Sequence, residues 1–101
     1  MPKLYEYFGL IVLFYSNEHE PIHVHGKYQG YESKAEIILE NGKYVDIVIK
    51  TVAGKDPLPK KELKNFVKLV QLYKEDIVRK WIDFFVYNVE IKPERINNRL
   101  K

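Results

Sequence analysis

All three histidines of the chain fall within seven residues, at His19, His23 and His25. If His23 and His25 lie on one strand, their side chains share a face with attachment points roughly 7 Å apart. Two imidazoles at that separation can reach one metal ion. The first interpretation is therefore a site in which the three histidines, with Glu18 or Glu20, hold a divalent transition metal such as zinc or nickel.

The same residue types also suit acid–base chemistry. An imidazole titrates near neutral pH, so His23 and His25 in opposite protonation states could cleave a phosphodiester, with RNA as the substrate class. Tyr15 or Lys27 would then stabilise developing charge. The third interpretation is a half-exposed strand whose histidines only bond to nearby carboxylates or backbone groups, and the sequence leaves the three open.

The composition limits the classes of protein that can carry this segment. The chain has 101 residues, of which 46% are hydrophobic and 14% aromatic, the size and content of one packed domain. With no cysteine, disulfides, Cys-ligated zinc, iron–sulfur clusters and thiol nucleophiles are excluded. The longest apolar run, residues 8–15, is shorter than the roughly 20 residues of a membrane span. We expect a cytoplasmic protein.

Hydrophobic patterning predicts the elements that position the histidines. Alternating or apolar segments predict strands over 4–7, 10–15, 22–28, 34–39 and 44–50, and helical spacing begins after Pro59. The predicted fold is α+β, with a small antiparallel sheet of four to five strands covered on one face by one long or two consecutive C-terminal helices. In this single domain the sheet spans 3–50, a loop 51–58, the helical region 59–86 and a tail 87–101.

Three local features of this fold can be predicted more closely. On the third strand Ile22 and Val24 should face the core, with His23 and His25 on the other face. A break in the helical region is expected near residues 74–76. In the tail the alternation at residues 89–92 predicts an edge strand, followed by a polar end that frays.

The segment between residues 39 and 44 predicts a hairpin. A three-residue loop of Glu40, Asn41 and Gly42 would align Ala35, Ile37 and Leu39 with Val45, Ile47 and Ile49 on one face, whereas a two-residue Asn-Gly turn would scatter them. We expect the three-residue loop. It has one cost, because it sets Glu36 opposite Asp46.

Charge is divided unevenly between the halves of the chain. Residues 1–50 carry five basic and seven acidic side chains, and residues 51–101 carry twelve and seven, so the halves are −2 and +5. A basic stripe runs along the outer side of the predicted helix and is a weak candidate for holding a nucleic-acid backbone, or simply its solvated face: Lys60, Lys61, Lys64 and Lys68.

Residues 14–25 read F-Y-S-N-E-H-E-P-I-H-V-H and are followed by a short strand region and a helix containing Trp81. This arrangement resembles the bacterial family called domain of unknown function 4160, although members typically carry Pro-Pro where this chain has Pro21-Ile22. The resemblance implies a small cytoplasmic prokaryotic protein, often encoded beside another short protein in pairs of toxin–antitoxin type, with no established activity.

The function we expect on this basis is a binding or regulatory component of a toxin–antitoxin-like pair that acts through a neighbour-encoded protein partner. One alternative is a histidine-dependent phosphodiesterase, metal-assisted or metal-free, in which the lysine stripe holds the RNA backbone. The other is a metal-binding module without catalysis. Nucleic acid is a further candidate partner, a membrane is not, and the oligomeric state stays open.

Overall fold

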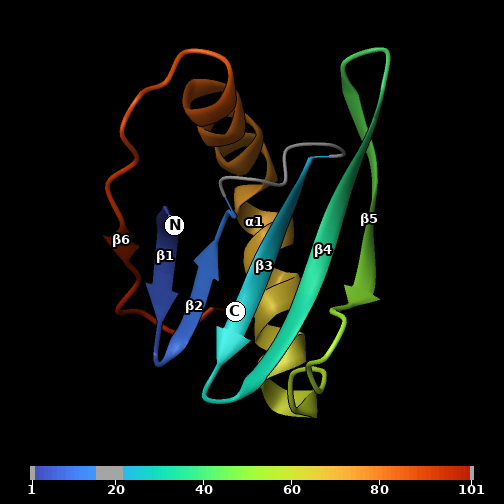
Figure 1. Ribbon diagram of the computed structural model, residues 1–101, viewed down its shortest axis with the longest axis vertical. Helices are drawn as coiled ribbons and strands as arrows, with labels where there is room; N and C mark the ends of the chain where they lie inside the picture. Colours follow the sequence, from blue (N-terminus) through green and yellow to red (C-terminus); the bar gives the residue numbers. More distant parts are fainter. Residues whose placement is uncertain (1, 16–21, 101) are drawn as a thin grey trace.

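The computed structural model describes residues 2–15 and 22–100 and has the predicted α+β architecture (Figure 1). The sheet contains β1 (Lys3–Tyr7), β2 (Leu10–Leu13), β3 (His23–Tyr28), β4 (Tyr31–Glu40), β5 (Lys43–Thr51) and β6 (Glu94–Arg95), in the order β5-β4-β3-β2-β1-β6. One helix, α1 (Lys60–Phe85), lies against one face. The prediction of four to five antiparallel strands is therefore wrong in detail, because β6 adds a sixth strand parallel to β1.

The C-terminal tail does not form the strand predicted at residues 89–92. Asn88 adopts a left-handed conformation and the Val89 N–H donates to the Asp83 carbonyl at 2.8 Å, so this segment completes the end of the helix. Beyond it the chain returns along β1, where the Ile96 N–H donates to the Glu6 carbonyl at 2.8 Å. The Leu100 N–H donates to the Tyr7 hydroxyl at 3.1 Å, so the tail is anchored up to this point instead of frayed.

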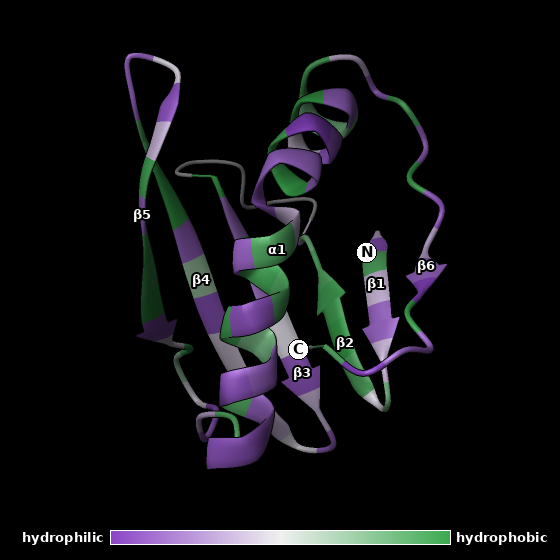
Figure 2. Ribbon diagram, turned by 180° about the vertical axis from the view of Figure 1, so that it is seen from behind, coloured by the Kyte–Doolittle hydropathy of each residue, from purple (hydrophilic) through white to green (hydrophobic). Residues whose placement is uncertain are grey.

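Helix α1 covers the sheet with one apolar side, packed against β2, β3 and β4 (Figure 2). Its backbone departs from helical geometry at Tyr73 (φ −109°, ψ 15°), next to the break predicted at 74–76. Within residues 2–15 and 22–100, no helix is long and apolar enough to cross a bilayer. The helix contributes five buried side chains to the core: Phe66, Leu69, Val70, Ile77 and Trp81.

Gly26 sets how closely the helix approaches the sheet. A Cβ atom at this position would lie 2.7 Å from Cδ1 of Phe66, a distance that real side chains essentially never show. Because Phe66 is fully buried, its ring has little room to move away. The absent side chain of Gly26 therefore makes the space that the Phe66 ring fills at the centre of the β3–α1 contact.

The β4–β5 hairpin corrects the predicted register. Asn41 and Gly42 both have positive φ (54° and 79°), as in a two-residue type I′ turn, and Glu40 pairs with Lys43. A bulge at Val45, between the Leu39–Tyr44 and Ile38–Asp46 pairs, then restores the alternation that such a turn alone would break.

After this bulge the side chains on the two faces of the hairpin fall into matched pairs. On the helix-facing side Ile47 pairs with Ile37. On the other side Glu36 lies opposite Val48 and forms a 3.1 Å ion pair with Lys50. The like-charge contact expected between Glu36 and Asp46 is absent from the hairpin.

Candidate functional site

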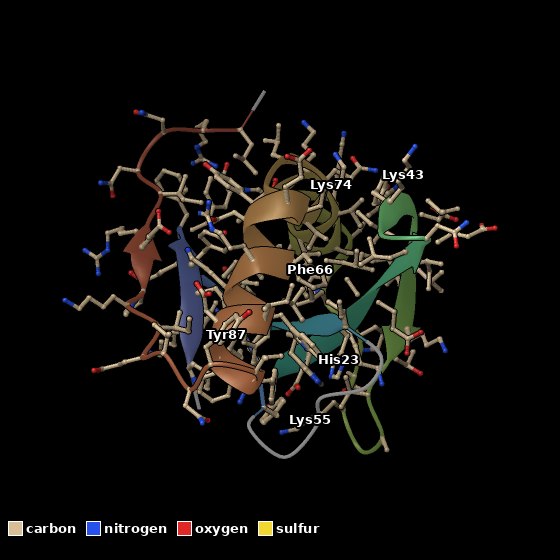
Figure 3. All side chains as sticks on the ribbon, turned by 90° about the horizontal axis from the view of Figure 1, so that it is seen from above. His23, Lys43, Lys55, Phe66, Lys74 and Tyr87 are labelled. Atoms are coloured by element: carbon tan, nitrogen blue, oxygen red, sulfur yellow. The ribbon has the colours of Figure 1, made fainter. Side chains whose placement is uncertain are left out.

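Strand β3 presents its histidines on the sheet face that points away from α1. Val24 and Gly26 belong to the helix side, since Val24 lies in the core and Gly26 meets Phe66. Figure 3 places Phe66 and His23 on opposite sides of β3. The predicted division of side chains is confirmed. Both histidines are nonetheless buried, at 4% and 2% exposed, so the strand is not half-exposed at these positions as the third interpretation supposed.

A carboxylate and a phenol surround His25. Its Nδ1 lies 2.9 Å from Oε2 of Glu32, and the Tyr15 hydroxyl donates to the same oxygen at 3.0 Å. The Tyr15 and His25 rings meet edge to face with centroids 4.4 Å apart. Glu32 is itself only 2% exposed, so this triad is a desolvated polar cluster. Three strands build it: the extension of β2, the middle of β3 and the start of β4.

The Glu32 carboxylate can assign a role to each nitrogen of the His25 ring. An Nδ1–H that donates to a carboxylate leaves Nε2 as the basic atom or metal ligand, and it holds the ring in one orientation. The His23 ring stands 5.2 Å from that of His25, between centroids. Oε1 of Glu32 is buried and has no hydrogen-bond partner among the described residues. The cluster thus contains an oriented imidazole, a neighbouring imidazole and an acceptor atom without a described donor.

The other predicted site residues lie on both sides of the sheet. Lys27 shares the face of His23 and His25, because it follows them at a spacing of two on β3, and it is half-buried. The lysine stripe lies on α1, against the opposite face of the sheet, with Lys60, Lys61 and Lys64 exposed and Lys68 half-buried. The sheet stands between this stripe and the histidines, so the two lie on opposite faces of the molecule (Figure 1).

The metal interpretation depends on residues that the structure does not describe. His19, Glu18 and Glu20 all fall in residues 16–21, outside the described part of the chain. Within residues 2–15 and 22–100, no group of three or more His, Asp or Glu side chains is arranged to hold a metal ion. His23 and His25 are close enough to share an ion, but they supply only two of the ligands that a zinc site needs.

Glu32 is the site residue that the sequence interpretation missed. The fourth strand was expected to begin at residue 34, whereas β4 begins at Tyr31, directly after a tight turn in which Tyr28 pairs with Tyr31. With the strand extended, Glu32 pairs with Lys27 and lies diagonally across from His25. A signal existed in the sequence, because Glu32, Lys34 and Glu36 alternate with the apolar positions of this strand.

A second polar cluster joins β1, α1 and β6 on the helix side of the sheet. The Tyr5 hydroxyl donates to Asp76, which also pairs with Arg79 and, at 3.0 Å, with Lys80; Lys80 pairs in turn with Glu94. Burial and the hydrogen bond to Asp76 raise the pKa of Tyr5 well above its ordinary range. Burial opposes ionisation of Asp76, but the Tyr5 and Lys80 hydrogen bonds and nearby cations outweigh it and lower its pKa. This cluster fastens the tail to the helix.

Comparison with known proteins gives a family without an assigned activity. Residues 9–82 match the family described as Domain of unknown function (DUF4160). The matched region runs from the β1–β2 turn to Ile82 in α1 and includes Tyr15, His23, His25 and Glu32. No curated protein and no solved structure matches the chain. The candidate site therefore lies wholly inside the part that the family shares, whereas β6 lies outside it.

Proposed function

The chain belongs to the family described as Domain of unknown function (DUF4160), and we propose that it is a binding or regulatory protein that acts through a protein partner, as one half of a toxin–antitoxin-like pair. The observation that carries the binding role is the open edge of β5. The paired-gene context is what the family resemblance implies. The nature of the partner's docking segment follows from the chemistry of that edge.

Strand β5 ends the sheet on one side, and among the described residues no strand covers its outer edge. It is nine residues long, and apolar side chains are exposed along it: Val45 (51%), Tyr44 (39%), Val48 (36%) and Ile49 (36%). An edge strand presents backbone donors and acceptors that an added strand can bind. On β5 the Ile47 N–H already donates to Oδ1 of Asp46 at 2.8 Å, so an added strand must replace that bond. An extended segment of the partner, with apolar residues at alternate positions, fits this edge by strand addition.

A cavity of about 180 Å³ lies beside this edge, between the hairpin and α1. Ile37, Leu39 and Val78 contribute apolar walls, and Tyr44 lines the cavity from β5. The Lys74 ammonium lies 4.8 Å from the centroid of the Tyr44 ring. A helix-facing apolar side chain of an added strand could enter this space. That contact would supply the apolar burial that backbone pairing alone lacks.

Co-purification with the neighbour-encoded partner tests the proposal. The chain and a tagged partner are co-expressed, with Val48→Lys as the edge variant and Leu72→Lys as the matched control, since Leu72 is a 62% exposed position on α1. We expect wild type and the control to co-purify with the partner. The amount of Val48→Lys recovered with the partner should be at least tenfold lower. A wild-type chain that stays unpartnered, or an edge variant that binds like the control, overturns the proposal.

A second candidate function, histidine-dependent phosphodiester cleavage, is favoured by the His25–Glu32–Tyr15 geometry. That reaction requires RNA to reach two rings that are only 4% and 2% exposed. Nε2 of His25 would then take the proton of an RNA 2′-hydroxyl as its oxygen attacks phosphorus. His23 would donate a proton to the departing 5′-oxygen. Glu32 is a positioning residue for His25, and Lys27 is the cation on the same face that could offset phosphate charge.

Cleavage assays on tag-free protein decide this second candidate. We expect His25→Ala and His23→Ala to abolish cleavage of single-stranded RNA. Glu32→Gln should slow it and shift its pH profile, since the imidazole loses its charged acceptor, while the lysine variant Lys60→Ala should cleave as wild type does. Metal analysis of the same preparation separates a metal-binding module, in which a stoichiometric ion is lost in His23→Ala, from both other functions. Wild-type protein without cleavage, with or without added divalent metal, excludes the enzyme.

A further inference from the structure

The regular part of β5 can pair with its own copy. Because Val45 is bulged, the uninterrupted strand begins at Asp46 and continues to Thr51. Asp46, Val48 and Lys50 point to the sheet face away from α1, as do their partners Ile38, Glu36 and Lys34 on β4. Asp46 stands two residues before Val48 and Lys50 two residues after it. Two antiparallel copies of the strand centred on Val48 therefore place opposite charges next to each other.

Antiparallel pairing of two β5 edges about Val48 joins opposite charges. Asp46 of each copy lies directly opposite Lys50 of the other, Ile47 lies opposite Ile49, and the two Val48 side chains meet at the two-fold axis. Cross-strand neighbours share a face, so the ion pairs and the valines are on one side of the joined sheet and the isoleucines are on the helix side. From Asp46 to Lys50 every side chain meets a partner of matching chemistry.

Other registers lose this match. A two-fold axis at Ile47 sets Asp46 against Val48 and Tyr44 against Lys50, and an axis at Ile49 sets Lys50 against Val48. The charges on β5 therefore select one register for self-pairing. Charged residues at an edge ordinarily prevent strand pairing, but here Asp46 and Lys50 favour a strand that brings the opposite charges to them, as a second copy does.

Lys50 can make the new contact without giving up its present one. Its ammonium lies 3.1 Å from Oε1 of Glu36 and its side chain is 52% exposed. Since an ammonium has three donors, it can bind Glu36 of its own chain and Asp46 of the other together. The pairing would also cover Val48 and Ile49, each 36% exposed in the single chain.

We propose that, in the absence of its protein partner, a second copy of the chain occupies the β5 edge, in antiparallel register about Val48. The inference rests on the proposed function, because it assigns β5 as the binding edge. It adds a form of regulation, since self-pairing and partner binding use the same backbone groups and exclude one another. A protein partner must therefore compete with the dimer.

Charge exchange tests the inference. Tag-free wild type, Asp46→Lys, Lys50→Glu and the double variant are measured by light scattering and sedimentation over a concentration series, with Lys60→Glu as an exposed control on α1. We expect wild type and the control to dimerise, and each single variant to raise the dissociation constant about tenfold, because two ion pairs become two repulsions. The double variant restores the pairs and should dimerise again. Circular dichroism checks that every variant is folded.

The outcomes separate this inference from the proposed function. Monomeric wild type at all concentrations, single variants that dimerise like wild type, or a folded double variant that stays monomeric overturns the self-pairing. If the partner still co-purifies and Val48→Lys still abolishes that binding, the proposed function stands without it. If the chain dimerises by the charge rules and never binds the partner, self-pairing stands and the proposed function fails.

Discussion

Replacing Gly26 with alanine should destabilise the fold by overpacking the contact between β3 and α1. The new Cβ would lie 2.7, 2.9 and 3.0 Å from the Cδ1, Cε1 and Cγ atoms of Phe66, whose ring is fully buried. Extra atoms in a packed core cost about 1–3 kcal/mol. For a domain of this size that corresponds to a fall in melting temperature of roughly 5–20 °C.

The contact between Gly26 and Phe66 indicates both a matched control for Gly26→Ala and a second substitution that should relieve its effect. Gly30→Ala adds the same methyl group where nothing lies within 4 Å, so it should leave the melting temperature nearly unchanged or raise it slightly. Phe66→Leu removes the ring that the new methyl meets. In the Gly26→Ala/Phe66→Leu protein the total loss should be smaller than the sum of the two single losses, by about 0.5–3 kcal/mol.

Urea unfolding followed by circular dichroism, together with thermal melts, gives these free energies. The reasoning is refuted if Gly26→Ala is as stable as Gly30→Ala. It is also refuted if the losses of Gly26→Ala and Phe66→Leu simply add, because the methyl and the ring would then not be in conflict. In either case α1 would not be as close to β3 as the Gly26–Phe66 contact requires.

Three further predictions concern ionisation and the hairpin turn. The pKa of Asp76 is lowered in the fold, so its contribution to stability is present above the ordinary Asp pKa of about 3.9 and is lost as pH falls. Asp76→Asn should therefore weaken the acid dependence of the free energy of unfolding, measured with urea between pH 6 and 2. Because the pKa of Tyr5 is raised, its contribution is present below about pH 10 and is lost at higher pH, so Tyr5→Phe should unfold less steeply than wild type in an alkaline titration followed by circular dichroism. Gly42→Ala, at φ +79° with open space around it, should cost about 1–2 kcal/mol from backbone strain alone, and a thermal melt indistinguishable from wild type would contradict the type I′ turn.

The local periodicity of apolar residues predicted much of the fold. The spacing of apolar residues after Pro59 predicted the helix, and the alternation from residue 22 predicted that His23 and His25 point away from the core. Both predictions succeeded because a helix or strand repeats its side-chain directions at a constant interval, whatever lies next to it. The histidine cluster marked, from residue types alone, the segment in which the structure places the polar cluster of His25, Glu32 and Tyr15.

Side-chain partners across strands could not be predicted in the same way. Glu32 joins His25 only because β4 begins at Tyr31 and pairs with β3 in a particular register, and the burial of both side chains depends on that pairing. The bulge at Val45 decides which residues of β5 share a face, and a single inserted residue reverses the outcome. Without the bulge, Asp46 and Lys50 would not flank Val48 on the outer face.

The sequence by itself determined the α+β class, the absence of cysteine chemistry and the segment that carries the histidines, because composition and periodicity are local properties. Only the tertiary structure decided that Glu32 and Tyr15 complete the cluster, that the lysine stripe lies across the sheet from it, and that β5 is left as an open edge. Those outcomes depend on strand order and register. Both are set by the packing of the whole sheet against α1, which no short stretch of residues encodes.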